Sequence, residues 1–135
     1  MGSNPQFSAD SDSRNGVASI ALRGELDMAT LPDFEGHLEP FESNGVSAIM
    51  LDLRELTFID STGLHALVRA KERANTNGKQ LILVGARPSA RRLFELTCTD
   101  RLLDDQDVFG VIKQFTGSRT SLIGETSKAR LDAEV

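Results

Sequence analysis

The residues best suited to chemistry in this sequence form the run Thr57-Phe58-Ile59-Asp60-Ser61-Thr62-Gly63-Leu64. An apolar, strand-like stretch precedes Ser61 and an amphipathic stretch follows it, so its hydroxyl is expected where a strand leads into a helix. The first N–H groups of a helix lack intrahelical partners, and the helix dipole is positive there. Such a position accommodates a phosphate, and a serine there can acquire one. The sequence therefore favours a switched binding module over an enzyme, with Ser61 as the modified residue and no catalytic residue.

Two neighbours of Ser61, Thr62 and Gly63, each have two interpretations, and the spacing leaves both open. Ser61 itself is a residue type that often caps a helix. Thr62 is either a second hydroxyl acceptor or an ordinary residue of the first helical turn. Gly63 either lets a kinase backbone or a nucleotide approach closely, or relieves crowding in that turn. Asp60 adds negative charge beside any phosphate on Ser61 and should strengthen the exclusion of a partner.

Five further residues are candidates for binding or chemistry. Asp27 and Asp52 are either carboxylates that bind a partner or accept hydrogen bonds, or solvated acids at strand ends. His37 and His65 match no metal-ligand spacing and are expected at the surface. Cys98 is the only cysteine, so no internal disulfide can form, and we expect a small buried residue near a helix end. The sequence predicts neither a metal site nor a cofactor.

Composition limits the class of protein. A chain of 135 residues with 39% hydrophobic and 26% charged residues is expected to form one soluble domain. The net charge of −5, without a Lys/Arg cluster, argues against nucleic acid, and the aromatic residues are all Phe. No apolar run approaches the ~18 residues of a membrane helix, and the N-terminus lacks a signal-peptide pattern. These features predict a cytoplasmic location without membrane contact.

The elements that must position Ser61 follow from turn residues and apolar spacing. Asn15-Gly16 predicts a type I′ hairpin between a weakly marked strand from Phe7 and a strand over 17–26. After it we expect a helix capped by Thr30 and ended by Asn44-Gly45, a strand over 48–56, a helix over 61–77, a strand over 81–84, a helix from Pro88, a short strand at 102–103 and a covering helix over 108–115. This order predicts an α/β fold with a mixed sheet, antiparallel at the first hairpin and then parallel, packed with about four helices. We expect a flexible N-terminus over 1–6, a domain over 7–115 and a polar, flexible tail over 116–135.

Three motifs in this order resemble the STAS domain, and in particular the free-standing anti-sigma factor antagonists of bacteria. They are Gly24-Glu25-Leu26-Asp27, Leu51-Asp52-Leu53 and Phe58-Ile59-Asp60-Ser61-Thr62-Gly63-Leu64, and the segment Arg92-Leu93-Phe94-Glu95-Leu96-Thr97 matches the third helix of that family. The chain departs from the family at the end of this helix, where Cys98 and Thr99 replace the usual glycine and apolar residue. The acidic segment over 104–107 and the tail after Phe115 are further departures.

The resemblance implies a partner and a switch. An unphosphorylated antagonist of this family binds an anti-sigma factor with a GHKL-type ATPase fold and thereby frees a sigma factor. That anti-sigma factor is also a serine kinase, whose target corresponds to Ser61, and a PP2C-type phosphatase reverses the modification. The resemblance makes Asp27, Asp60, Ser61, Thr62 and Gly63 the expected partner-binding residues.

Other functions fit the sequence less well. A response-regulator receiver would use Asp52 as its phosphoacceptor, but no acidic pair follows a first strand to hold Mg²⁺. A hydrolase would need a nucleophile elbow around Ser61, and a nucleotide-binding enzyme would need a glycine-rich P-loop, and neither is present. The alternative that keeps the fold is a STAS scaffold, or an accessory module of a transporter, without a phosphoserine switch.

Overall fold

The computed structural model describes residues 6–103, which form four strands, three α-helices and a 3-10 helix. In chain order these are β1 (Phe7–Arg14), β2 (Val17–Leu26), α1 (Leu31–Ser43), β3 (Ala48–Ile59), α2 (Ser61–Thr76), β4 (Gln80–Val84), α3 (Pro88–Leu96) and the 3-10 helix Asp100–Leu102. The predicted elements within these residues are thus present. The short strand expected at 102–103 is reduced to one parallel bridge, between Leu83 and Leu103. The expected helix over 108–115 and the tail lie outside the described residues.

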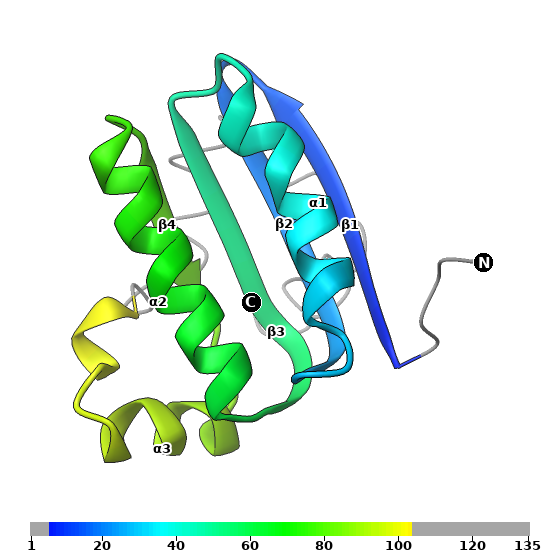
Figure 1. Ribbon diagram of the computed structural model, residues 1–135, viewed down its shortest axis with the longest axis vertical. Helices are drawn as coiled ribbons and strands as arrows, with labels where there is room; N and C mark the ends of the chain where they lie inside the picture. The colour runs from blue at the N-terminus through cyan, green and yellow to red at the C-terminus, as the bar shows by residue number, and fades with distance from the viewer. Residues whose placement is uncertain (1–5, 104–135) are drawn as a thin grey trace, which may run out of the picture.

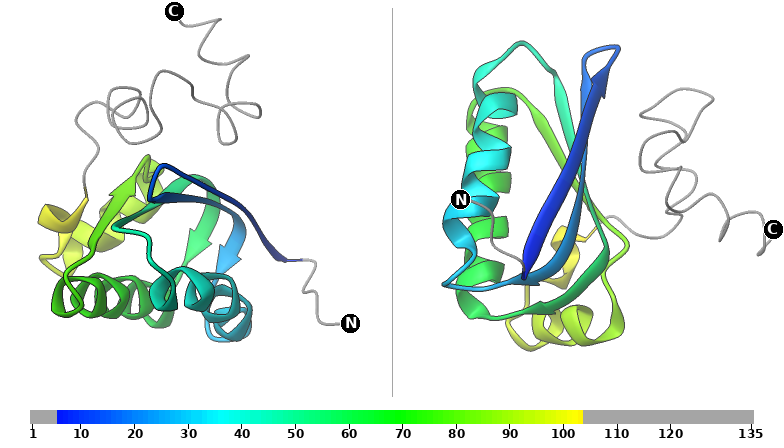
Figure 2. Two further views of the ribbon diagram at one scale, coloured as in Figure 1. Left: turned by 90° about the horizontal axis from the view of Figure 1, so that it is seen from above. Right: turned by 90° about the vertical axis from the view of Figure 1, so that its right-hand side faces the viewer.

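The strands form one sheet in the order β1-β2-β3-β4. β1 and β2 are antiparallel, whereas β2 with β3 and β3 with β4 are parallel, which confirms the predicted mixed α/β sheet (Figure 1). Both parallel pairs step across the sheet in the same direction. Because such crossovers are right-handed, their helices must lie on the same face. α1 and α2 do lie side by side on one face (Figure 2).

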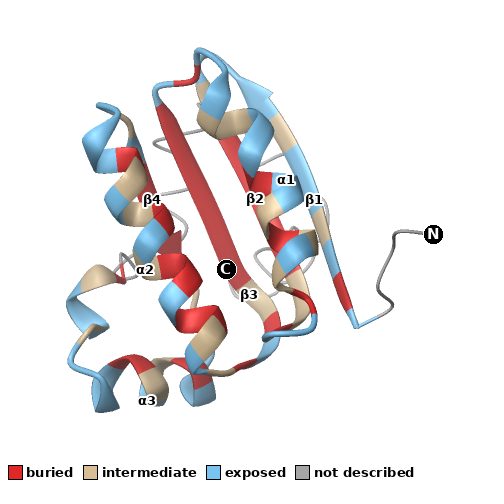
Figure 3. Ribbon diagram, in the orientation of Figure 1, coloured by how far each residue is buried: buried red, intermediate tan, exposed pale blue. Residues whose placement is uncertain are grey.

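The main core lies between this face of the sheet and the two helices. The strands supply alternate apolar residues, namely Ala18, Ile20, Leu22, Ile49, Leu51, Leu53, Leu81 and Leu83. Phe34 and Leu38 of α1 and Leu64 and Leu67 of α2 pack against them, at the helical spacing read from the sequence. Residues between these on the strands, including Met50, Asp52 and Val84, are buried as well. Buried residues therefore run unbroken along the first half of β3 (Figure 3).

β1 is a polar edge strand of eight residues, longer than its sequence suggested. The turn that joins it to β2 has positive φ at both central residues, 56° at Asn15 and 79° at Gly16, as a type I′ hairpin requires. Asp12 and Arg14 face solvent along the strand and approach to 3.5 Å. Charged side chains on an exposed edge discourage pairing with other chains.

α2 and α3 end in the same hydrogen-bonded motif with different residues at its critical position. Gly78 (φ 73°) follows α2, and Cys98 (φ 60°) occupies the equivalent position after α3. The next residue in each case donates back to the helix, from Lys79 N to Ala74 O and from Thr99 N to Phe94 O, both at 2.8 Å. The expectation that Cys98 is buried was wrong. The side chain is exposed because the left-handed turn directs the chain away from the helix.

Replacing Cys98 by glycine should stabilise the protein. A non-glycine residue in the left-handed region costs about 1–2 kcal/mol, part of which is offset by the greater freedom of glycine in the unfolded chain. We expect Cys98→Gly to raise the free energy of unfolding by about 1 kcal/mol, measured by urea denaturation. Cys98→Ala is the matched control, since it removes the thiol and keeps the strain. Equal stabilisation by both variants would show that the backbone conformation is not the cause.

Candidate functional site

The site around Ser61 lies where β3 extends beyond the end of its neighbour β4. β4 ends at Val84, which pairs with Asp52, whereas β3 continues to Ile59 alongside β2. Two register shifts give β3 one extra residue each time, first between the pairs Ala21–Asp52 and Arg23–Glu55 and then between Gly24–Leu56 and Glu25–Phe58. Bulges of this kind bend a strand and redirect its side chains. They carry the end of β3, and with it the start of α2, to one end of the domain.

Asp60, and not Ser61, caps α2. One Asp60 carboxylate oxygen (Oδ1) accepts the backbone N–H of Gly63 at 2.8 Å. Ser61 is the first residue inside the helix and is exposed, and within residues 6–103 its hydroxyl has no hydrogen-bond partner. Thr62 is only half-exposed. Asp60 is therefore the residue that caps α2, in place of Ser61. The Ser61 hydroxyl is left free at the positive end of the α2 dipole.

Gly63 is required by internal packing. A Cβ atom at this position would lie 2.4 Å from the Leu26 carbonyl oxygen and 3.0 Å from Cγ1 of Ile59. The missing side chain thus faces the ends of β2 and β3, not a partner approaching from outside. Asp60 N also donates to Leu26 O at 3.3 Å. The first turn of α2 is consequently pressed against the end of β2, and only glycine fits there.

We expect Gly63→Ala to destabilise the domain by about 1–3 kcal/mol, because the backbone oxygen that the new methyl group meets cannot swing away as a side chain would. Gly36 provides the matched control. It also lies within a helix, but a Cβ there meets nothing within 4 Å. Gly36→Ala should therefore stabilise by up to about 1 kcal/mol through helix propensity. Denaturation midpoints of the two variants should move in opposite directions, and a shared direction would contradict this account.

The turn between β2 and α1 is the second wall of the site. Thr30 is fully buried, and its hydroxyl donates to Glu25 O at 2.8 Å and accepts from Asp27 N at 3.0 Å. Asp27 Oδ1 in turn accepts the Thr30 N–H at 3.1 Å. Thr30 occupies the predicted cap position of α1 but makes no side-chain cap hydrogen bond. These reciprocal bonds fix the turn next to the Leu26 carbonyl that α2 contacts, so Asp27 lies at the same end of the domain as Ser61.

Asp52 is a buried ion-paired residue and not a solvated acid. Its carboxylate forms a bidentate ion pair with Arg54, whose Nε lies 3.0 Å from Oδ1 and whose Nη2 lies 2.7 Å from Oδ2. Oδ1 also accepts the Arg54 backbone N–H at 3.0 Å, at the first bulge. Because both oxygens are engaged, the carboxylate is not free to accept a phosphoryl group. The geometry thus argues against the receiver alternative.

The remaining predicted residues do not add to the site. His37 and His65 are exposed, as expected. Residues 6–103 contain no cluster of His, Cys, Asp and Glu that could hold a metal ion. In the same part of the chain, no helix is both long and apolar enough to cross a membrane.

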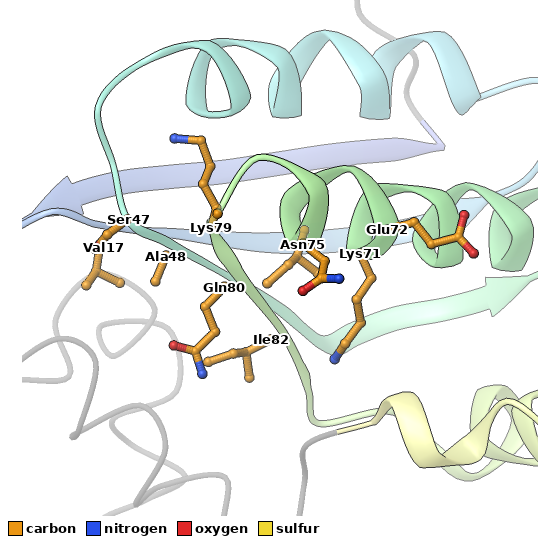
Figure 4. Close-up of a pocket in the computed structure, with 11 residues that line it drawn as sticks. Val17, Ser47, Ala48, Lys71, Glu72, Asn75, Lys79, Gln80 and Ile82 are labelled. Carbon is orange, nitrogen blue, oxygen red and sulfur yellow. The ribbon is translucent and has the colours of Figure 1, made fainter.

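A large hollow lies at the other end of α2. It has a volume of about 770 Å³ and opens beside the starts of β2, β3 and β4, where Val17, Ala48 and Gln80 line it (Figure 4). α2 has 16 residues, so its two ends are separated by roughly 24 Å. Both lysines of the lining are engaged, since Lys79 Nζ donates to Val46 O at 2.6 Å and Lys71 Nζ donates to Leu102 O at 3.0 Å. None of the residues that line this hollow belongs to the Ser61 site.

Comparison with known proteins identifies the family. The model of the STAS domain matches residues 8–114. The chain belongs to the STAS domain family. The anti-sigma-B factor antagonist of Staphylococcus aureus is 36% identical to this STAS domain over 78 residues, which are 58% of this chain and 72% of the relative.

Solved structures agree with this assignment. An anti-sigma factor antagonist from Mycobacterium paratuberculosis matches the STAS domain described here with a TM-score of 0.71 and 25% identity, over 84% of this chain and 98% of that one. The unphosphorylated anti-sigma factor antagonist SpoIIAA matches with a TM-score of 0.68 and 19% identity, over 82% and 97% of the two chains. The phosphorylated form of SpoIIAA, a Bacillus cell fate determinant, matches with a TM-score of 0.63 and 18% identity, over 79% and 98%. The last two likenesses show the shared fold.

The sequence predicted which segments lie around Ser61 but not the exposed apolar side chains at the same end of the domain. Asp27, Asp60, Ser61, Thr62 and Gly63 do lie at one end of the domain. The exposed apolar side chains beside them were missed, namely Met28, Phe58 and Leu96. Alternation along the strand gave no signal for Phe58, because the second bulge changes the face on which it lies.

Proposed function

We propose that this STAS domain is an anti-sigma factor antagonist acting in the cytoplasm, and that phosphorylation of Ser61 controls its binding. The unphosphorylated protein binds an anti-sigma factor with a GHKL-type kinase fold and so releases a sigma factor. Phosphorylation of Ser61 ends this complex, and a PP2C-type phosphatase restores it. The curated relative in Staphylococcus is named for antagonism of an anti-sigma factor, and SpoIIAA is described in both unphosphorylated and phosphorylated forms.

The observation that carries the proposal is the free, exposed hydroxyl of Ser61 at the positive end of α2. No residue of 6–103 engages this hydroxyl, and the neighbouring carboxylate of Asp60 is held by the Gly63 N–H. The chain therefore offers Ser61 as a substrate rather than as an activated nucleophile. In the transfer, Ser61 Oγ bonds to the γ-phosphorus of ATP, the bond to the bridging oxygen breaks and ADP leaves. The hydroxyl proton passes to a base of the kinase.

The effect of the phosphate is on the interface and not on the fold. A phosphoryl group brings about −1.5 to −2 charges at neutral pH. At an exposed helix N-terminus this charge is worth only about 0.3–1 kcal/mol to the domain itself. Covered by a partner and placed beside Asp60, the same charge would be desolvated and repelled, and like charges brought together can cost several kcal/mol. Because about 1.4 kcal/mol corresponds to a tenfold change in affinity, this suffices to separate the complex.

The proposal is tested by phosphorylation in vitro. The purified protein is incubated with ATP and each GHKL-type anti-sigma factor of its source cell, and mass spectrometry locates the phosphate. We expect modification of Ser61 and none of Thr62, whose side chain is less accessible. Ser61→Ala should abolish the modification, and a PP2C-type phosphatase should remove it from the wild type. Absence of phosphate from Ser61 with every such kinase would favour the STAS scaffold without a switch.

A further inference from the structure

Every large apolar side chain that residues 6–103 expose lies at the end of the domain that carries Ser61. These side chains are Met28, 72% exposed, Phe58, 48% exposed, and Leu96, 75% exposed. Met28 belongs to the turn before α1, Phe58 to the end of β3, and Leu96 is the last residue of α3. These three segments lie around the start of α2, at the lower end of the domain in Figure 1. Apolar residues gathered in this way mark a contact surface, whereas single ones scattered over a surface do not.

Two of the three flank a groove between β3 and α3. The groove has a volume of about 270 Å³ and is lined by Phe58, Ile59, Ser89, Arg92, Leu93 and Leu96. It exists because β4 stops early and α3 takes its place beside the extension of β3. Ala90 and Phe94 fill the space beneath α3 and are buried. The face of α3 that carries Ser89, Arg92, Leu93 and Leu96 forms the outer wall of the groove.

The groove combines apolar walls with one unpaired cation. Arg92 is exposed and forms no ion pair with residues 6–103. Ser61 is flanked instead by the acidic residues Asp27 and Asp60. The end of the domain thus has an acidic half around Ser61 and a basic, apolar half along α3.

We propose that this groove is a second docking site for the same anti-sigma factor, which inserts an apolar side chain between Phe58 and Leu96 and presents a carboxylate to Arg92. The inference rests on the proposed function. Phe58 lies three residues before Ser61, at the end of β3, so the groove adjoins the surface that a partner covering Ser61 would contact. The cation selects a partner surface on which an acidic group lies beside the apolar one. Aromatic and arginine side chains are the residues in which interface energy usually concentrates.

The groove and the acidic half around Ser61 would then have different roles within one interface. The groove supplies affinity that does not depend on the charge of Ser61, so it can hold the kinase while Ser61 reacts. The acidic half supplies the control, because the phosphate is added there.

The test compares three variants in titrations against the purified GHKL-type anti-sigma factor. Leu96→Ser removes an exposed side chain, so the fold should persist, and it should lower the affinity by about 10- to 30-fold. Arg92→Gln should slow association and reduce its dependence on salt concentration. Gln80→Ser, an exposed position at the opposite end, is the control and should bind as the wild type does.

The outcomes separate this inference from the proposed function. Wild-type affinity for Leu96→Ser, together with weakened binding of Ser61→Glu, would overturn the groove and leave the switch intact. Weakened Leu96→Ser with unaffected Ser61→Glu would support the groove and overturn the switch. Failure of the wild-type protein to bind any such anti-sigma factor would overturn both.

Discussion

Ser61→Glu is expected to weaken the complex with the anti-sigma factor by about 100-fold, whereas Ser61→Ala should change the affinity by no more than about threefold. Glutamate introduces a negative charge beside Asp60 at a position that the partner would cover. Burying like charges together costs several kcal/mol, and about 2.7 kcal/mol corresponds to 100-fold. Alanine removes only a hydroxyl that has no partner within residues 6–103. Isothermal titration of the three proteins against the anti-sigma factor gives the comparison.

A charge control distinguishes local blockade from a change in net charge. Ser43→Glu adds the same charge to the last residue of α1, which is exposed at the opposite end of the domain. It should bind as the wild type does, and the thermal midpoint of Ser61→Glu should stay close to that of the wild type because the charge suits a helix N-terminus. Equal affinities of Ser61→Glu and Ser61→Ala would rule out electrostatic blockade. A large loss of stability in Ser61→Glu would instead point to a change in the fold.

Asp52→Ala is expected to lower the free energy of unfolding by about 3–5 kcal/mol. The substitution leaves the Arg54 guanidinium, whose side chain is only 16% exposed, without the carboxylate that balances it. It also leaves the Arg54 N–H at the bulge without its acceptor. A buried charge that loses its partner is costly, whereas removing both charges is much less so. The double variant Asp52→Ala with Arg54→Met should therefore be more stable than Asp52→Ala alone, by urea denaturation.

The chain contains a natural control for this pair. Asp12 and Arg14 have the same residue types at the same spacing on β1, but their side chains are 37% and 43% exposed. Exposed ion pairs are worth about 0–1 kcal/mol, so Asp12→Ala should change stability by no more than that. Similar losses from Asp12→Ala and Asp52→Ala would show that burial does not set the cost.

The order of elements and the position of Ser61 at a helix start could be predicted from local patterns. Asn15-Gly16 determines a turn by its backbone preferences, and the apolar spacing of α1 and α2 determines which face each helix buries. Asp60-Ser61 follows an apolar strand and precedes an amphipathic helix, which places the hydroxyl at a helix start. Each of these features depends on residues close together in the sequence, and each is confirmed by the structure.

The features that the sequence left open, and the one that it predicted wrongly, concern contacts between distant segments or the path of the backbone. The cap role of Asp60 depends on the direction in which the chain leaves β3, and the need for glycine at position 63 depends on the Leu26 carbonyl of another strand. The burial of Asp52 follows from its place on a central strand, paired with Ala21 and Val84, and the face on which Phe58 lies depends on the second bulge against β2. Cys98 was expected to be buried because cysteine usually is, but the left-handed turn that ends α3 exposes it.

The separate origins of the three exposed apolar side chains have a consequence for cells that hold several such proteins. Met28, Phe58 and Leu96 come from a turn, a strand end and a helix end, while Ser61 and its cap belong to a fourth segment. Under the proposed scheme, duplicated copies can diverge in their apolar contacts one residue at a time while the phosphorylation chemistry is unchanged. Parallel signalling circuits that use the same reaction can in this way be insulated from one another.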